Sequence, residues 1–236
     1  MSSEIKVYFP CSWGITAEEL LGFYTKLSPQ NSPWVQPVID INDADYVIVQ
    51  DIPDEAIPPN KKVIFFQREP HYVIPLSRNK YDKPNLDRSY YHDKGECWLP
   101  QTWWISLSYD ELKSLEYPEK TELISVVDSG RVALHGHKNR LEAISKVLNV
   151  IPELHIYGKI TAGRENVKPF KTALPPREKE AAFLKYKYAL VIENGQTPYY
   201  FSEKIIDPLL CWTTPIYWGC SEISKYFPSG SFIEIK

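Results

Sequence analysis

The sequence predicts an α/β protein built from two Rossmann-like halves, and three observations support this fold class. In the second half, short apolar runs alternate with amphipathic helical runs, an order that gives parallel strands joined by helical crossovers. The first half shows the same kinds of segment, more loosely spaced. The chain has 236 residues, of which 43% are hydrophobic and 24% charged, which suffices for one large or two small domains with real cores.

The first half is expected to contain three strands and one helix. Apolar, β-branched and aromatic runs predict strands at Ile5–Phe9, Tyr46–Gln50 and Val63–Phe66, and apolar periodicity predicts a helix at Ala17–Leu27. The connection Ile52–Pro59 is rich in proline, which favours extended or turn backbone.

The region 81–109 holds seven aromatic residues and few aliphatic ones. We expect an irregular connection there, with the aromatic side chains packed in the core and between domains. A surface on which glycans stack is the alternative interpretation. The domain boundary is expected near 112–121, which gives a first domain at 1–117 and a second at 118–236.

The second half alternates strands and helices over its whole length. Apolar runs ending at turn residues predict the strands, and one-face apolar spacing predicts the helices. The expected strands are Leu123–Val127, His155–Tyr157, Tyr188–Ile192 and Pro215–Trp218. The expected helices are His137–Val150, Arg177–Tyr186 and Ser202–Leu210.

Composition excludes several classes of protein. No apolar run approaches the roughly 18 residues of a membrane span, so we expect a soluble chain with no transmembrane segment. The first residues show no basic segment followed by an apolar one. The four cysteines, at positions 11, 97, 211 and 220, are widely spaced and form no CxxC motif, which favours reduced core thiols. We therefore expect a cytoplasmic location.

The charge is unevenly distributed. The net charge of −3 divides into −6 for residues 1–118 and +3 for the remainder. A mildly basic second half is a weak indication of a phosphate-bearing ligand, and two solvated surfaces that simply differ in charge are the favoured explanation. It is too weak for nucleic acid, which we do not expect as a partner.

The familiar nucleotide loops are missing from the sequence. The segment Gly130–Asn139 has the wrong glycine spacing for a P-loop, and no G-x-G-x-x-G follows a strand, so a dinucleotide oxidoreductase is not indicated. What remains is a helix start that carries Lys138 and Arg140. Helix N-termini attract anions, and the alternative is a solvent-exposed basic turn.

Metal-binding motifs are weak. The pair Asp43 and Asp45 could hold a divalent metal and a diphosphate, but that motif should follow a strand, whereas here a strand comes after it; a turn is favoured. His135 and His137 have no Cys or carboxylate at ligand spacing. We therefore expect no metal site.

The segment 186–219 contains the clearest candidates for ligand-binding residues. A strand delivers polar residues to the carboxyl edge of a parallel sheet, where open α/β proteins bind ligands. Ser202 is placed to cap the next helix. Lys204 then lies in the first turn, where the helix dipole disfavours a cation, and an anionic ligand would resolve that conflict. The polar residues at this edge are Glu193, Asn194, Tyr200, Glu203 and Lys204.

The spacing of these residues resembles a family signature. The sequence runs Glu193-Asn194, five positions, Tyr200, one position, Ser202-Glu203-Lys204, and later Pro215 to Gly219. This is similar to the E-N-(x5)-Y-x-T-E-K and P-(hydrophobic)-G pattern of the α-1,3/4-fucosyltransferase family. In the first half, Phe66–Pro70 resembles the family's short E-S-P-like motif.

This resemblance implies a GT-B-like fold, two Rossmann-type domains whose parallel sheets face across a cleft, and inverting transfer of L-fucose from GDP-fucose to a glycan hydroxyl. The donor belongs to the second domain and the acceptor to the first, and no metal is obligatory. The implied roles are Lys204 and Arg140 at the diphosphate, Glu203 at the ribose, Asn194 and Tyr200 along the diphosphate and sugar pocket, and Glu69 as general base.

The sequence departs from the family pattern at three positions. Ser202 replaces Thr and keeps the cap, Gly195 replaces the usual Ser, and Tyr199 stands where an acid is common. Two alternatives stay open at this stage. One is the same fold and chemistry with another donor, such as UDP-xylose or a different GDP-sugar. The other is a non-catalytic protein that binds sugar nucleotides or glycans.

Overall fold

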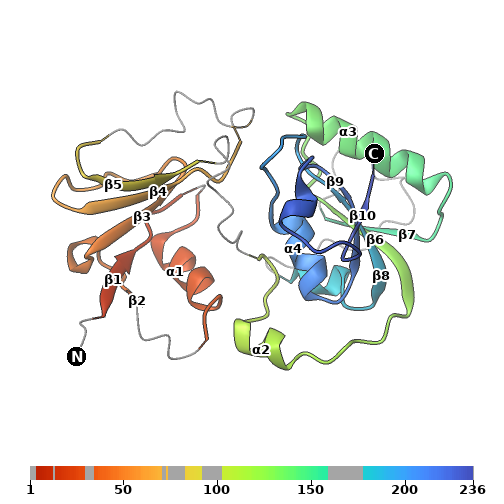
Figure 1. The fold of residues 1–236 in the computed structure, drawn as a ribbon, viewed down its shortest axis with the longest axis horizontal. Coiled ribbons are helices and arrows are strands. Elements are labelled where there is room, and N and C mark those ends of the chain that lie inside the picture. The colour runs from red at the N-terminus through yellow and green to blue at the C-terminus, as the bar shows by residue number, and fades with distance from the viewer. Residues whose placement is uncertain are drawn as a thin grey trace. The chain divides into compact units, whose positions relative to one another are not determined.

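The computed structural model describes residues 4–12, 14–29, 35–70, 73, 83–91, 103–158 and 178–235. The chain divides into two compact units, one of Met1–Leu99 with Ser108–Asp110 and one of Pro100–Leu107 with Glu111–Lys236. Each unit contains one five-stranded sheet whose strand pairs are all parallel (Figure 1). The predicted α/β class with two parallel sheets is therefore confirmed.

The first unit has the strand order β2-β1-β3-β4-β5. Its helix α1 begins with a capping box, in which Thr16 and Glu19 each bond the other's backbone N–H. Buried side chains of β3 and β4, among them Val47 and Phe65, form the centre of its core. The elements are β1 (Ile5–Tyr8), α1 (Ala17–Thr25), β2 (Val35–Pro37), the 3₁₀ turn η1 (Ile41–Asp43), β3 (Tyr46–Gln50), β4 (Lys62–Phe66) and β5 (Leu86–Tyr90).

Two edge strands of this sheet were not expected from the sequence. β2 is three residues long and mostly exposed, and β5 reads Leu-Asp-Arg-Ser-Tyr. An edge strand pairs through its backbone with a single neighbour, so it needs no continuous apolar face. The prediction that 81–109 is an irregular connection is therefore wrong at Leu86–Tyr90.

The second unit has the strand order β10-β9-β8-β6-β7. The helix α2 (Tyr109–Ser114) lies where the chain passes between the two units. The remaining elements are β6 (Glu122–Asp128), α3 (His135–Leu148), β7 (Leu154–Gly158), η3 (Lys179–Ala182), β8 (Tyr186–Ile192), α4 (Glu203–Leu210), β9 (Thr214–Trp218), η4 (Ile223–Lys225) and β10 (Ile233–Glu234).

Both faces of the second sheet are buried. On β8, Leu190 and Ile192 pack in the cluster that contains Ile144 of α3, whereas Val191 packs with Ile205 of α4. The two helices thus cover opposite faces (Figure 1). This arrangement explains why β8 is a continuous apolar run and not an alternating one.

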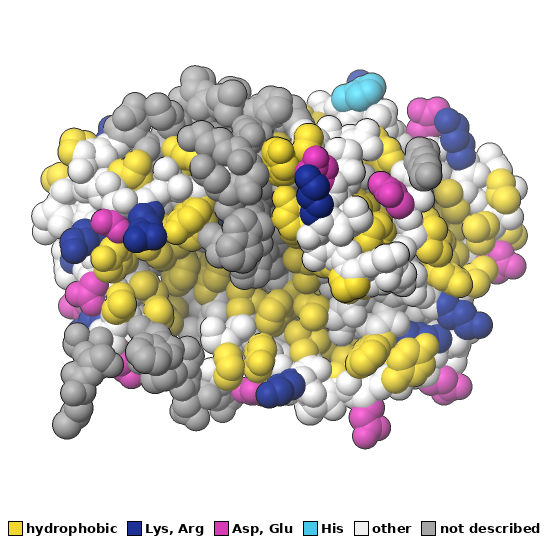
Figure 2. Space-filling model, in the orientation of Figure 1, with side chains coloured by type: hydrophobic (Ala, Val, Ile, Leu, Met, Phe, Trp, Pro, Cys, Tyr) yellow, Lys and Arg dark blue, Asp and Glu magenta, His cyan; other side chains and the backbone are white. Residues whose placement is uncertain are grey.

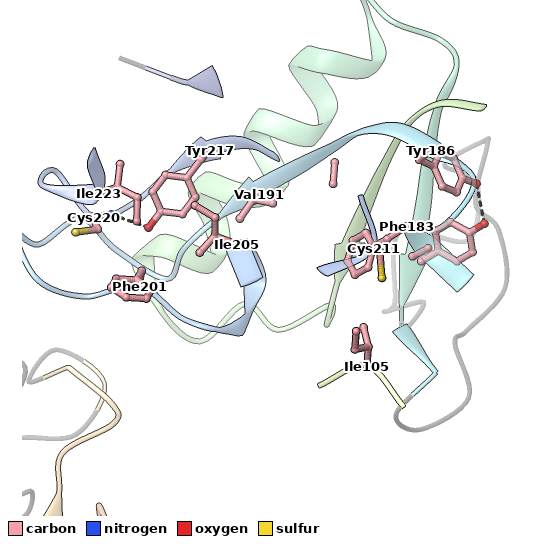
Figure 3. Packing of buried hydrophobic residues seen from close by; sticks show 13 residues of the cluster. Ile105, Phe183, Tyr186, Val191, Phe201, Ile205, Cys211, Tyr217, Cys220 and Ile223 are labelled. Atoms are coloured by element: carbon pink, nitrogen blue, oxygen red, sulfur yellow. Dashed lines mark hydrogen bonds between the residues drawn. The ribbon is translucent and has the colours of Figure 1, made fainter. Parts of the chain in front are cut away.

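The cluster on the α4 side contains buried aromatic rings with satisfied hydroxyls (Figure 3). The hydroxyl oxygens of Tyr157 and Tyr186 lie 2.7 Å apart, and the backbone N–H of Cys220 donates to the hydroxyl of Tyr217 at 2.8 Å. Burying a phenol without a partner is costly, so these bonds let large aromatic side chains fill the core.

The helix predicted at Arg177–Tyr186 is wrong within the described residues. The backbone forms only the short 3₁₀ turn η3, and β8 already begins at Tyr186. The hydroxyl of Ser125 donates to the carbonyl of Ala182, and that of Thr213 donates to the carbonyl of Phe183. These carbonyls are bonded by distant side chains, and Tyr186 enters the core, so helix propensity is overridden.

Three of the four cysteines fall within the described residues, and all three are free thiols. Burial raises the pKa of Cys211 to about 12 and that of Cys220 to about 11. Both are therefore uncharged core residues at neutral pH. Cys97 lies outside the described residues. In the part of the chain that the structure describes, no helix is both long and apolar enough to cross a bilayer.

Candidate functional site

The candidate site lies at the carboxyl ends of the strands of the second sheet. There β6 ends at Asp128 and β8 is followed directly by Glu193 and Asn194. The helices α3 and α4 begin at the same edge, because each follows one of these strands in the chain. Open α/β sheets bind ligands at this edge, and helix N-termini there attract anions.

Glu193 is a fully buried carboxylate that fixes the start of α4. It is 0% exposed, and its Oε1 accepts the backbone N–H of Ser202 at 2.8 Å. Its Oε2 accepts the hydroxyl of Ser202 at 2.8 Å and the ammonium of Lys204 at 3.2 Å. The buried charge is thereby bonded and paired, as burial in a low dielectric requires.

These contacts answer a question that the sequence left open. Lys204 is a cation in the first turn of α4, where the helix dipole disfavours positive charge. From the sequence alone, we expected an anionic ligand to compensate this charge. The structure shows that Glu193 compensates it from within the protein. The Ser202 cap is confirmed, since its hydroxyl accepts the backbone N–H of Lys204 at 3.3 Å.

Two glycines allow the strand end to pack this closely. A Cβ at Gly219 would lie 2.5 Å from Cγ of Glu193, and a Cβ at Gly136 would lie 1.6 Å from the carbonyl oxygen of Asn194. Neither distance is possible for real atoms. Glu193 and Asn194 are thus held between the segment after β9 on one side and the first turn of α3 on the other.

Arg140 joins α3 to the same strand end. Its side chain is buried, with the residue only 3% exposed. Its Nε donates to the carbonyl of Ile192 at 3.0 Å, and its Nη2 donates to Oδ1 of Asn194 at 2.6 Å. Its Nη1 lies 3.8 Å from a carboxylate oxygen of Asp128. The guanidinium is therefore fixed in place by the ends of two neighbouring strands, β8 and β6.

Positive charges from both helices converge on His137. Burial lowers the pKa of this imidazole, and nearby cations lower it further. These cations belong to Arg140, Arg131 and Lys204, with Asp128 in weaker opposition. His137 is therefore neutral at pH 7, and its Nδ1 lies 3.3 Å from the backbone N–H of Leu134, which donates to it. Three cations therefore lie close enough to this imidazole to lower its pKa.

The other two predicted donor residues have different surroundings. The carboxylate of Glu203 lies 3.3 Å from the ammonium of Lys179. Tyr200 is 3% exposed and packs below the surface. Among the predicted residues of this unit, the structure thus brings Arg140 into direct contact with Asn194, and it links Lys204 to the same strand end through Glu193.

Glu69 belongs to the first unit and follows β4. Its backbone N–H donates to the carboxylate of Asp51 at 3.1 Å, as does that of Arg68 at 2.8 Å. Asp51 is 3% exposed and has a left-handed φ of 50°. The guanidinium of Arg68 donates to the hydroxyl of Tyr24 at 2.8 Å. The loop that presents Glu69 is therefore tied at its backbone and at its neighbouring side chain.

Sequence reasoning missed several residues that build these sites. Asp51 immediately follows a predicted strand, and the rule that drew attention to Glu193 would have found it. Gly136 and Lys179 gave no such signal, because their importance comes from contacts with residues far away in the chain. Among the described residues, no group of three or more His, Cys, Asp or Glu is placed to hold a metal ion.

The charged surface is mixed. Among the side chains coloured in Figure 2, Lys and Arg are scattered over the visible face, several of them next to an acidic side chain. The expectation that nucleic acid is not a partner stays a prediction, and this distribution is compatible with it.

The fold and the site define a class before any comparison. Two parallel-sheet α/β units, one of which carries fixed cations and helix N-termini at its carboxyl edge, are the architecture of a GT-B-type protein. Comparison then gives the family. Residues 117–236 match the model of glycosyltransferase family 10 (fucosyltransferase), C-terminal part, and the chain belongs to this family.

A curated relative matches part of the chain. The alpha-(1,3)-fucosyltransferase FucT of Helicobacter pylori is 39% identical over 59 residues, which are 25% of this chain and 12% of that protein. The match therefore spans about an eighth of the relative's length.

Solved structures with the same fold extend over almost the whole chain. An α1,3-fucosyltransferase with GDP has a TM-score of 0.54 at 22% identity, and covers 99% of this chain and 74% of its own. A structure of an α1,3-fucosyltransferase with GDP-fucose has a TM-score of 0.53 at 21% identity, with coverages of 99% and 75%. At this identity the likeness establishes the fold.

Proposed function

We propose that the chain is an inverting fucosyltransferase, which transfers L-fucose from GDP-fucose to a hydroxyl of a glycan acceptor. The observation that carries this proposal is the edge of the second unit at which Arg140, Asn194 and Lys204 meet, in a chain of the fucosyltransferase family. Related folds are known with GDP and with GDP-fucose, which supports the same donor here.

The two fixed cations would act on the leaving group. Negative charge builds on the diphosphate as the bond to the anomeric carbon breaks, and donors aimed at that charge stabilise the transition state. Arg140 has five N–H donors, and its contacts with Ile192 and Asn194 engage only part of them. Lys204 would share its ammonium between Glu193 and a phosphate oxygen.

The other proposed contacts with the nucleotide-sugar are assigned from the positions of the residues at this sheet edge. Glu203 would accept hydrogen bonds from the ribose hydroxyls, and Asn194 and Tyr200 would line the diphosphate and sugar pocket. Cations of the protein neutralise the diphosphate in this proposal, so we expect transfer to proceed without a divalent metal. Undiminished activity in EDTA is the measurement that checks this.

Glu69 is proposed as the general base of the first unit. Its carboxylate would take the proton of the acceptor hydroxyl while the acceptor oxygen attacks the anomeric carbon and GDP leaves from the opposite face, which inverts the configuration. General bases contribute about 10²–10⁴-fold to rate. The backbone bonds from the Glu69 loop to Asp51 would hold this carboxylate in position.

A donor panel followed by a transfer assay tests the proposal. We expect GDP-fucose and GDP to raise the melting temperature, because a ligand at 100 times its Kd stabilises by about 2.7 kcal/mol. GDP-mannose, UDP and UDP-xylose should stabilise less. Stabilisation by UDP-xylose alone would favour the other donor, and stabilisation by no nucleotide would refute the proposal.

Transfer is then measured as GDP release in the presence of glycan acceptors. We expect Glu69→Gln to keep the thermal shift with GDP-fucose and to lose about 10²-fold or more of the release rate. Glu18→Gln, at an exposed glutamate of α1, is the matched control and should behave as the wild type. Donor binding without release over a broad acceptor set would favour a non-catalytic binding protein. The cytoplasmic location stays a prediction.

A further inference from the structure

One cluster of charges near the start of α4 contains two residues, Lys179 and Asp207, that have no place in the mechanism above. The ammonium of Lys179, from η3, lies 3.3 Å from Oε1 of Glu203 and 3.2 Å from Oδ2 of Asp207. The other oxygen of Asp207 accepts the backbone N–H of Trp104 at 2.7 Å. One ammonium thus joins two carboxylates, of which one also holds a segment about a hundred positions earlier in the chain.

The two carboxylates need this cation. Glu203 and Asp207 are four positions apart on α4, so their side chains share one face of the helix, and like charges at this spacing repel. Each contributes to keeping Lys179 protonated, since together they outweigh burial and raise its pKa. Burial, with Glu203 adding to it, raises the pKa of Asp207 to about 6. Without the ammonium, the two carboxylates would repel each other.

The side chains differ in exposure, which separates their roles. The side chain of Asp207 is 1% exposed, whereas those of Glu203 and Lys179 are 19% and 25% exposed. Asp207 is therefore an internal anchor, whereas Glu203 and Lys179 are both partly accessible from outside.

The segment that Asp207 bonds at Trp104 is also held by other contacts. Ile105, beside Trp104, is 0% exposed and belongs to the core cluster of this unit, whose residues Figure 3 draws. The backbone N–H of Ser106 donates to the carboxylate of Glu180 in η3 at 2.9 Å. The segment 103–107, η3 and α4 are thus joined by side-chain bonds, and Lys179 lies at the point where they meet.

We propose that Lys179 is a positioning residue for the donor site, which holds the Glu203 carboxylate in the orientation that accepts the ribose hydroxyls of the nucleotide. This inference rests on the proposed function, because it assigns a guanosine diphosphate to the same site. Lys179 acts through Glu203 and does not touch the donor. Its loss should therefore impair recognition of the ribose more than recognition of the diphosphate.

Calorimetry with three nucleotides tests this: GDP, 2′-deoxy-GDP and 3′-deoxy-GDP. A hydrogen bond to a carboxylate is a strong one, so the wild type should bind GDP about tenfold tighter than at least one deoxy analogue. In Lys179→Met this ratio should fall to within about twofold, mainly through weaker binding of GDP. Lys179→Arg, which keeps the charge and the donors, should largely retain the ratio.

Two further variants separate positioning from folding. Glu203→Gln should lose the ratio as Lys179→Met does, and the double variant should lose no more than either one. Lys146→Met, at an exposed lysine of α3 that pairs only with Glu142 among the described residues, is the matched control and should keep the ratio. If Lys179→Met does not fold, the same comparison is made with Lys179→Gln, which should also lose the ratio.

The outcomes are distinguishable. An unchanged ratio in Lys179→Met, or equal weakening of GDP and both deoxy analogues, overturns the positioning role while leaving the proposed function intact. A wild type that binds no GDP overturns the proposed function and this inference with it.

Discussion

Replacing Gly136 by alanine is a stringent test of the site geometry. The new Cβ would lie 1.6 Å from the carbonyl oxygen of Asn194, whereas real Cβ atoms essentially never approach closer than 3.0 Å. The strand end and α3 would have to separate by about 1.4 Å, the difference between these distances. The bond of 2.6 Å from Arg140 to Asn194 would then exceed hydrogen-bonding distance.

The expected change in the free energy of unfolding combines one stabilising effect and two destabilising effects. Alanine is favoured over glycine in a helix by at most about 1 kcal/mol, and Gly136 lies in the first turn of α3. Overpacking costs about 1–3 kcal/mol, and loss of a hydrogen bond from a charged donor costs about 1.5–3 kcal/mol. We therefore expect Gly136→Ala to lower the free energy of unfolding by about 2–4 kcal/mol, and to weaken GDP binding because Arg140 loses its fixed orientation.

Urea unfolding followed by tryptophan fluorescence measures the stability, and calorimetry measures the affinity for GDP. The matched control is Gly22→Ala in α1, where a Cβ meets nothing within 4 Å. That variant should be more stable by about 0.5–1 kcal/mol. A Gly136→Ala protein as stable as Gly22→Ala, with unchanged GDP affinity, would refute the proposed packing of α3 against the strand end.

Two further predictions concern other parts of the chain. The ammonium of Lys120 donates to the carbonyls of Leu184 and Cys211, and burial lowers its pKa from 10.5 to about 8. Between these values the unfolded chain binds more protons than the native one, so this group makes the free energy of unfolding rise with pH. Lys120→Met should remove that rise in urea unfolding at about pH 8 and pH 10, and an identical slope in both proteins would contradict it. Asp51→Ala removes the acceptor for the Glu69 N–H and places alanine at a left-handed φ. It should cost about 2–4 kcal/mol of stability and lower the rate of transfer with GDP affinity unchanged; a normal transfer rate would exclude Asp51 as the support of that loop.

Much of the second unit was predictable because its signals are local. β6, β8 and β9 are apolar runs that end at turn or polar residues, and Ser202 precedes a helical pattern. Parallel topology then places the ends of these strands at one edge, so Glu193, Asn194 and the start of α4 were expected together. The family motif follows the same local spacing.

Other elements depend on pairing with distant residues. The edge strand β5 has a polar sequence and forms because β4 offers its backbone. The segment at η3 has helix-forming residues, yet its carbonyls are bonded by Ser125 and Thr213. Such tertiary contacts override local propensity, and no window of sequence contains them.

By itself, the sequence determined the α/β class, the parallel order of the second half, and the set of polar residues delivered to one sheet edge, because these depend on periodicity and on spacing along the chain. Three features were decided only by the tertiary structure. Glu193 compensates the charge of Lys204, the missing side chain of Gly136 lets the backbone of Asn194 pack against α3, and Lys179 joins Glu203 to Asp207. Each of these is a contact of a few ångströms between residues far apart in the chain or on different elements, and its energy depends on burial that only the folded protein creates.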